Sequence, residues 1–185
     1  EKGIPAPEAI LDYGCGTGGS VPYLVGQFHP RRVVGVDISD ASLAVAGQQF
    51  PDAEFFTLEA YRPRGEIDLA FCNGVFHHIP PAKRKACAQY VFDALKPGGV
   101  FAFWENNPWN PGTRLIMKRV PFDRDAITLT PPESRQLLQS AGFVVERTDF
   151  LFIFPKMLAA LRWLEPPLCS LPLGGQYLVL ARKPQ

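Results

Sequence analysis

The sequence has no closely spaced pair of cysteines, no excess of charge of one sign and no long apolar run. Its 19 lysines and arginines nearly balance its 18 acidic residues, leaving a net charge of +1, so we expect no nucleic-acid partner. The four cysteines stand alone, which argues against a disulfide framework and favours a reducing, cytoplasmic location. No run approaches the roughly 18 apolar residues of a membrane span, so no transmembrane segment is expected.

Short apolar segments alternate with helical patterns through the first two thirds of the 185 residues. This alternation is typical of a parallel sheet covered by helices. A chain of this length is most simply one domain, so residues 1–185 are predicted to form a single α/β domain. The predicted strands are residues 9–13, 33–37, 53–57, 67–72, 100–104, 144–152 and 176–182.

Two of the predicted helices have clear sequence signals. Apolar residues at i, i+3, i+4 and i+7 mark a helix over residues 21–28. Thr130, Pro131 and Glu133 have the order of an N-cap, a first helical position and a capping-box partner. A second helix is therefore predicted to begin after Thr130 and to end at Gly142.

The stretch ILDYGCGTGGS, residues 10–20, contains a glycine-rich turn between a predicted strand and a predicted helix. Gly14, Gly16 and Gly19 fit G-x-G-x-x-G, which lets a nucleotide or a carboxylate approach the backbone at a helix N-terminus. Asp12 precedes these glycines, and a carboxylate about 4 Å from a ligand charge contributes on the order of 4 kcal/mol at an effective dielectric constant of about 20. Asp12 would repel a pyrophosphate and attract the ammonium and sulfonium groups of S-adenosylmethionine, so the loop favours that cofactor.

Four motifs resemble those of the class I S-adenosylmethionine-dependent methyltransferases, in particular the small-molecule enzymes of types 11 and 12. The motifs are ILDYGCGTG, VVGVDIS, IDLAFCNGVFHHI and LKPGGVFAFWE, at residues 10–18, 33–39, 67–79 and 95–105. The resemblance implies a Rossmann-like, doubly wound sheet of seven strands in the order 3-2-1-4-5-7-6, with the last strand antiparallel. It also implies helices ahead of the first strand. This sequence enters its first strand almost at once, so the N-terminal helices are predicted to be missing.

The resemblance also implies the cofactor-binding residues, position by position. Asp37, at the end of the second strand, would accept hydrogen bonds from the ribose hydroxyls. Ile38 would pack on the adenine. Glu59, with Ala60 beside it, stands where the family has an aspartate that receives the adenine amino group. The residues expected around the methionine side of S-adenosylmethionine are Asp12, Gly14, Cys15, Gly16, Gly18 and Asn73.

Residues that follow the fourth and fifth strands are expected to face the methyl acceptor, since ligands bind beyond the carboxyl ends of parallel strands. His77 is the candidate catalytic base, with a packing role in the loop as the alternative. His78 is interpreted as a loop residue beside the substrate. No metal is expected, because metal-dependent ubiquinone-type O-methyltransferases, to which this motif is also similar, have glutamates where this chain has Gly74 and His77. The other residues expected to line the acceptor pocket are Glu105, Asn106 and Trp109.

Two segments interrupt the alternation and are predicted to be insertions over the acceptor site, residues 105–130 and residues 155–175. The apolar side chains of residues 150–173 allow three interpretations: ordinary core, a hydrophobic acceptor pocket, or a surface that meets a lipid or a partner. Ordinary core is the default interpretation. The basic residues Lys83, Arg84 and Lys85 are interpreted as the solvated start of a helix.

The predicted function is transfer of a methyl group from S-adenosylmethionine to an oxygen, nitrogen or carbon atom of a small molecule, with an apolar acceptor as one option. An NAD(P)-dependent oxidoreductase is the alternative enzyme. Asp12 argues against it, and so does the lack of any tyrosine followed four residues later by lysine. A noncatalytic cofactor-binding module that regulates a partner is the alternative from another class. The oligomeric state does not follow from the sequence.

Overall fold

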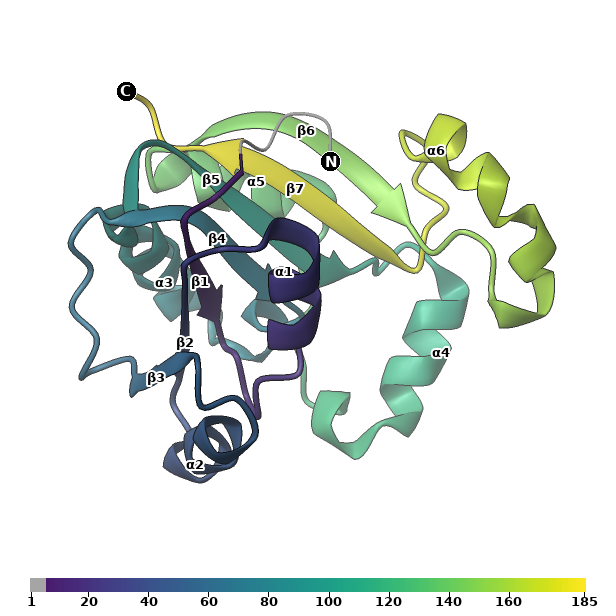
Figure 1. The fold of residues 1–185 in the computed structure, drawn as a ribbon. Helices are drawn as coiled ribbons and strands as arrows, with labels where there is room; N and C mark the ends of the chain where they lie inside the picture. Colours follow the sequence, from purple (N-terminus) through teal and green to yellow (C-terminus); the bar gives the residue numbers. More distant parts are fainter. Residues whose placement is uncertain (1–5) are drawn as a thin grey trace.

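The computed structural model describes residues 6–185, which form a single seven-stranded sheet (Figure 1). The strands are β1 (Ala9–Tyr13), β2 (Arg32–Asp37), β3 (Glu54–Thr57), β4 (Ile67–Asn73), β5 (Leu95–Asn106), β6 (Val144–Leu151) and β7 (Gln176–Arg182). Their order is β3-β2-β1-β4-β5-β7-β6, and β7 is antiparallel to both of its neighbours while the pairs from β3 to β5 are parallel. The predicted Rossmann-like fold, strand order and antiparallel last strand are confirmed.

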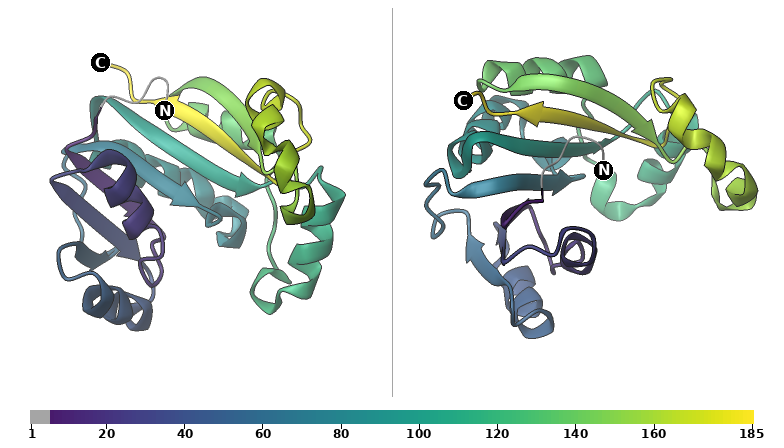
Figure 2. Two further views of the ribbon diagram at one scale, coloured as in Figure 1. Left: turned by 45° about the vertical axis from the view of Figure 1, so that its right-hand side comes forward. Right: turned by 45° about the horizontal axis from the view of Figure 1, so that its top comes forward.

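Helices cover the two faces of the sheet unequally. The helices are α1 (Val21–Phe28), α2 (Asp40–Gln49), α3 (Pro81–Ala94), α4 (Pro111–Arg119), α5 (Pro131–Ser140) and α6 (Glu165–Leu168), with three 3₁₀ segments, η1 (Phe76–His78), η2 (Pro121–Asp123) and η3 (Lys156–Leu164). Buried residues of α3 and α5 pack in one core with one face of the sheet, whereas Leu24 of α1 packs in a smaller core on the other face. In Figures 1 and 2, α4 and the η3–α6 segment extend beyond the sheet.

The alternation of side chains along β5 divides its residues between these two cores. Phe101 and Phe103 lie in the larger core with α3 and α5, and Phe103 meets Phe76 edge-on at 4.9 Å between ring centroids. Ala102 and Trp104 belong to the smaller core on the side of α1. Successive residues of a strand point to opposite faces, so the end of β5 presents different side chains to each side of the sheet.

The predicted capping box at the start of α5 is confirmed. The Thr130 hydroxyl accepts the backbone N–H of Glu133, and the Glu133 carboxylate accepts the backbone N–H of Thr130 at 2.7 Å. Such caps satisfy backbone donors that have no partner within the helix. Inside the protein, Ser134 of α5 and Tyr177 of β7 join their hydroxyl groups at 2.6 Å, which ties this helix to the sheet.

Arg84 is buried, so its interpretation as part of a solvated helix start is wrong. It is only 8% exposed. Its guanidinium donates hydrogen bonds to the backbone carbonyls of Phe76, Ile79 and Ile127, at 3.0, 2.9 and 2.5 Å. The Phe76 carbonyl also accepts the Ile79 N–H at the end of η1. Arg84 therefore joins η1 to the chain that follows η2.

The apolar residues of η3 are not core, so the default interpretation of residues 150–173 is wrong for this segment. No residue of η3 is buried, and Met157 and Trp163 are 94% and 73% exposed. The other two interpretations of the segment, and its role as an insertion, stay predictions. So does the single-domain assignment, whose first five residues lie outside the described residues. Within residues 6–185, no helix is both long enough and apolar enough to cross a bilayer.

Candidate active site

The glycine-rich turn after β1 takes backbone conformations that favour glycine. Gly14, Gly16 and Gly18 have φ angles of 74°, 53° and 82°, in the left-handed region. A Cβ atom on Gly14 would lie 2.5 Å from Val75, and one on Gly18 would lie 2.7 Å from Phe50. A Cβ atom on Gly16 would meet nothing within 4 Å. The turn is therefore packed from behind at Gly14 and Gly18, while Gly16 faces open space.

Asp37 holds this turn from the end of the neighbouring strand β2. One carboxylate oxygen accepts the backbone N–H of Gly16 at 2.8 Å, and the other accepts the backbone N–H of Ser39 at 2.9 Å. Each carboxylate oxygen can accept more than one hydrogen bond. Asp37 thus fixes the loop and keeps acceptor capacity for a ligand.

Asp12 is a buried carboxylate with an unsatisfied oxygen. It is 2% exposed, and its Oδ2 atom has no hydrogen-bond partner among the described residues. The pKa of Asp12 is raised to about 7, first by burial and then by the nearby charge of Asp37, although a hydrogen bond from Ser20 lowers it. An unsatisfied buried polar group costs roughly 1–3 kcal/mol. A cationic ligand in the adjoining turn would remove that penalty.

The residues predicted to meet the adenine lie exposed around the end of β2 and after β3. Ile38 is 83% exposed although its side chain is apolar, and it directly follows Asp37. Glu59 and Ala60 are exposed in the turn after β3, where the Ala60 N–H donates to the backbone carbonyl of Thr57 at 3.1 Å. The structure thus brings an apolar side chain, a carboxylate and Asp37 to neighbouring strand ends. Cys15 is buried behind the turn, and burial raises the pKa of its thiol to about 12.

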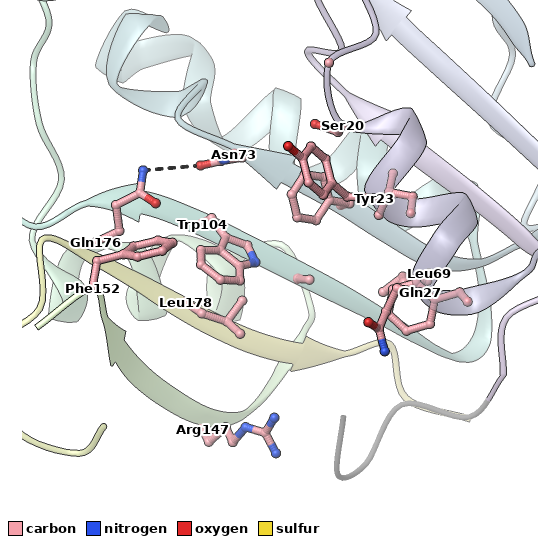
Figure 3. Close-up of a pocket in the computed structure, with 15 residues that line it drawn as sticks. Ser20, Tyr23, Gln27, Leu69, Asn73, Trp104, Arg147, Phe152, Gln176 and Leu178 are labelled. Atoms are coloured by element: carbon pink, nitrogen blue, oxygen red, sulfur yellow. Dashed lines mark hydrogen bonds between the residues drawn. The ribbon is translucent and has the colours of Figure 1, made fainter. Parts of the chain in front are cut away.

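Three amide side chains meet where β4, β5 and β7 come together. Gln176 donates from Nε2 to the Oδ1 atom of Asn106 at 3.2 Å. It also donates to the Oδ1 atom of Asn73 at 3.5 Å (Figure 3). Gln176 is a candidate site residue that the sequence did not indicate. It begins β7, and because β7 runs antiparallel to β5, its first residue lies beside the last residue of β5.

A cleft of about 730 Å³ opens beside these amides on the face of the sheet that carries α1. Its walls are mostly aromatic and aliphatic, and Figure 3 shows Trp104 and Phe152 close to Gln176 while Tyr23 approaches from α1. The Trp104 ring lies 6.5 Å from that of Phe71 and 6.3 Å from that of Phe152. The cleft can therefore accommodate an apolar group next to the polar strand ends.

His77 and Glu105, both predicted to act at the acceptor, form a buried pair on the face with α3 and α5. His77 Nδ1 lies 2.6 Å from Glu105 Oε2, and the second Glu105 oxygen accepts the Phe76 N–H at 2.7 Å. His77 Nε2 faces Asp123 Oδ1 of η2 at 3.5 Å. Burial lowers the pKa of His77, but its hydrogen bond to Glu105 and the charges of Glu105 and Asp123 together raise it above its ordinary value.

His78 and Trp109 lie apart from the amides at the strand ends. His78 Nε2 faces Asp123 Oδ1 at 3.4 Å, and burial and the charge of His77 lower the pKa of His78. Trp109 stacks on Phe150 at 6.3 Å and lines a different, smaller pocket from the one that contains Asn73. The structure thus brings Asn106, predicted to meet the acceptor, together with Asn73, predicted to lie on the methionine side of the cofactor. It separates them from the histidines and from Trp109.

A seven-stranded sheet of this order, with a glycine turn after β1 and an acidic residue ending β2, defines the class I S-adenosylmethionine-dependent methyltransferases. Residues 10–99 match the family model described as a methyltransferase domain. Over these residues the chain matches this family of methyltransferases, and the predicted family resemblance, enzyme class and cofactor are confirmed. A dehydrogenase or a noncatalytic module is not supported.

Curated relatives and solved structures agree with this family. The chain is 33% identical over 122 residues to a trans-aconitate 2-methyltransferase of Variovorax paradoxus, covering 63% of this chain and 46% of that protein. It is 27% identical over 194 residues to a trans-aconitate 2-methyltransferase of Escherichia coli, covering 95% of this chain and 75% of that protein. An S-adenosylmethionine-dependent methyltransferase from Mesorhizobium loti superposes with a TM-score of 0.70 at 22% identity, covering 97% of this chain and 92% of the other.

The residues present fit S-adenosylmethionine. The cofactor carries an ammonium group, and the unsatisfied Oδ2 of Asp12 is a buried acceptor next to the glycine turn. Gly16 leaves open space where a side chain would intrude. Asp37 and the exposed Ile38 stand at the next strand end, as a ribose and an adenine require.

Proposed function

We propose that this protein transfers the methyl group of S-adenosylmethionine to a carboxylate oxygen of a small organic acid. The observation that carries the cofactor half of the proposal is the buried, unsatisfied Asp12 oxygen beside the glycine turn. The acceptor half draws on the two relatives named trans-aconitate 2-methyltransferases, since trans-aconitate is a small molecule with several carboxylates.

The chain's own residues would bind the cofactor through charge, hydrogen bonds and apolar contact. Asp12 would pair with the ammonium group, and Asp37 would accept the ribose hydroxyls while it holds the turn at Gly16. Ile38 would cover one adenine face, and Glu59 would accept the adenine amino group. Ala60 would lie beside the adenine, and Cys15 would contribute its backbone. When bound, S-adenosylmethionine supplies a methyl group that its sulfonium has already activated.

The polar strand ends would orient the acceptor. Asn73, Asn106 and Gln176 together offer amide N–H donors next to the methionine side of the proposed cofactor site. A carboxylate oxygen is ionised near neutral pH and needs no base to become a nucleophile. Alignment of two reactants can supply several kcal/mol of the rate enhancement. We therefore infer that catalysis depends on positioning the acceptor against the methyl group. General-base catalysis by His77 is the alternative to be tested.

An apolar acceptor is the second candidate, and the cleft beside Trp104 favours it. The cleft holds about 730 Å³ and opens beside Asn73 and Gln176. Apolar walls with a few convergent polar groups are typical of small-molecule sites. An apolar acceptor would lie against Phe71 and Phe152 with its reacting atom at the amides.

A methyl-transfer assay on the purified protein tests both halves. Labelled S-adenosylmethionine is offered with trans-aconitate and other small di- and tricarboxylates, and in parallel with phenols, amines and apolar alcohols. We expect label to enter a carboxylate as a methyl ester, which mass spectrometry identifies. Transfer to a phenol or an alcohol alone would favour the apolar candidate. Calorimetry should show binding of S-adenosylmethionine and no binding of NAD or NADP, and the opposite result would contradict the cofactor proposal.

A further inference from the structure

Three potential metal ligands converge at the junction of η1 and η2. They are His77, His78 and Asp123, whose ligand atoms all lie within 4.8 Å of one another. The histidines follow β4, whereas Asp123 belongs to the segment after α4, so the fold joins two distant parts of the chain. Neither the family match nor the proposed methyl transfer requires this cluster.

The two nitrogen–oxygen distances fit shared coordination better than hydrogen bonding. Asp123 Oδ1 lies 3.5 Å from His77 Nε2 and 3.4 Å from His78 Nε2. Hydrogen bonds between nitrogen and oxygen are usually about 2.7–3.2 Å long. Two ligands of one tetrahedral zinc ion, each bound at about 2.0–2.2 Å, lie roughly 3.3–3.5 Å apart. The spacing around Asp123, which is also that of an ion pair, is therefore compatible with ligands of a common ion.

The buried partner of His77 selects the nitrogen that would bind metal. Glu105 Oε2 lies 2.6 Å from His77 Nδ1, and the other Glu105 oxygen is fixed by the Phe76 N–H at 2.7 Å. A hydrogen on Nδ1 would make Nε2, which faces Asp123, the nitrogen that binds an ion in exchange for its own proton. A carboxylate bound to the far nitrogen of a metal-ligating histidine is the usual support of such a ligand, because it fixes the ring and raises its basicity.

The surroundings leave one side of the cluster accessible. The His77 side chain is buried, whereas those of His78 and Asp123 are 25% and 17% exposed. Phe122 packs on His78 with 4.2 Å between ring centroids. Because His78 is partly exposed, its ring can adjust to bring its nitrogen to coordination distance. A fourth position would be open to water or another small ligand.

We propose that His77, His78 and Asp123 form a binding site for one divalent transition-metal ion of the zinc type. Two imidazoles and one carboxylate are a donor set that suits zinc, cobalt and nickel. The ion would fasten the segment that contains α4 and η2 to η1, beside the end of β4. The expectation of no metal depended on glutamates missing at positions 74 and 77, and the ligands proposed here are a different set.

Metal titration of the purified, chelator-treated protein tests the proposal. We expect one equivalent of Zn²⁺ to bind by calorimetry and to raise the thermal midpoint, because a ligand that binds only the folded state stabilises it. Co²⁺ at the same site should give the visible absorption of a tetrahedral ion. Absence of stoichiometric binding by both ions would overturn the proposal.

Variants of the proposed ligands distinguish metal binding at this site from metal binding elsewhere on the protein. Asp123→Asn and His78→Gln change partly exposed side chains and should each weaken Zn²⁺ binding at least tenfold and abolish the cobalt spectrum. Asp125→Asn is the matched control, because Asp125 is an exposed carboxylate two residues from Asp123. It should bind like the unchanged protein. If Asp123→Asn and His78→Gln also bind like the unchanged protein, the ion binds elsewhere and the proposed site is wrong.

Discussion

Asp37 accepts the backbone N–H of Gly16 at 2.8 Å and so joins the end of β2 to the turn after β1. The carboxylate proposed to hold the cofactor ribose is thus also a structural support of the loop that would surround the methionine side. Cofactor affinity and loop order are coupled through one side chain, and this coupling determines how variants at Asp37 should behave.

Asp37→Ala should weaken S-adenosylmethionine binding at least about tenfold, the factor that corresponds to about 1.4 kcal/mol. It removes the ribose acceptor and also the partners of the Gly16 and Ser39 amides. The thermal midpoint should fall modestly while the fold remains. Asp37→Asn keeps one acceptor oxygen. Its loss in the free energy of unfolding should therefore be smaller than its loss in the free energy of cofactor binding. Calorimetry and circular dichroism measure both quantities, and an unchanged affinity in Asp37→Ala would mean that the ribose lies elsewhere.

Asp12→Asn should stabilise the cofactor-free protein at alkaline pH. The folded-state pKa of Asp12 is about 7, above its usual value near 4, so the folded protein binds a proton that the unfolded chain releases. This stability is present below about pH 4 and is lost as the pH rises to about 7, with a span of roughly 4 kcal/mol. Asparagine removes that dependence. Denaturation with urea between pH 4 and pH 8 should show a flatter profile in the variant.

The same substitution should weaken cofactor binding, because the ammonium group loses its anionic partner. In the unchanged protein, affinity for S-adenosylmethionine should rise with pH through about 7 as Asp12 ionises. Calorimetry across that range measures the effect. Equal pH dependence in the unchanged protein and in Asp12→Asn would show that Asp12 does not contact the cofactor's charge.

His77→Gln should lower the free energy of unfolding while changing the rate of methyl transfer little. The pKa of His77 is raised in the folded protein, so its contribution to stability is present below about pH 6.5 and is lost as the pH rises through the higher folded value. The variant should therefore lose most stability at acidic pH. Methyl transfer to a carboxylate should stay within about tenfold of the unchanged enzyme. A loss of roughly 10²- to 10⁴-fold, with cofactor affinity intact, would instead identify His77 as a general base.

Gln176→Leu should reduce methyl transfer while cofactor affinity changes little. Gln176 joins Asn73 and Asn106 at the strand ends but lies outside the glycine turn, so its loss should affect the acceptor or the transition state alone. Gln48→Leu, on the exposed side of α2, is the control. Equal turnover in both variants would mean that the acceptor binds away from these amides.

Local sequence patterns were sufficient for most of the fold. The predicted boundaries of β1 and β7 agree with the structure, and the capping box at Thr130 begins α5 as expected. These features depend on residues close together in the chain, such as an alternating strand or an N-cap with its partner three residues on. The strand order required the family resemblance, since no local pattern specifies which strands pair.

Contacts between distant segments were not predictable from such patterns. Arg84 is basic and stands near a helix start, yet it is buried because its guanidinium bonds backbone carbonyls of two other segments. Gln176 reaches the ends of β4 and β5 because β7 is antiparallel. Asp123 reaches the histidines because the chain after α4 returns to η1, where the Ile127 N–H bonds the His77 carbonyl. Helix α4 was not predicted from the sequence, for a different reason. Asn110 caps α4 as Thr130 caps α5, but Pro108, Pro111 and Gly112 around the cap also favour turns.

Trp104 gives the cleft a built-in optical reporter. Its ring lies in the aromatic wall with Phe71 and Phe152, whereas the other two tryptophans, Trp109 and Trp163, are 49% and 73% exposed. Solvated indoles emit at longer wavelength than indoles in apolar surroundings, so the intrinsic fluorescence should contain one component from the cleft and two from the surface. A molecule that enters the cleft would displace water from Trp104 alone. Occupancy can then be followed in the unlabelled protein as a blue shift of that component, with Trp104→Phe as the silent reference.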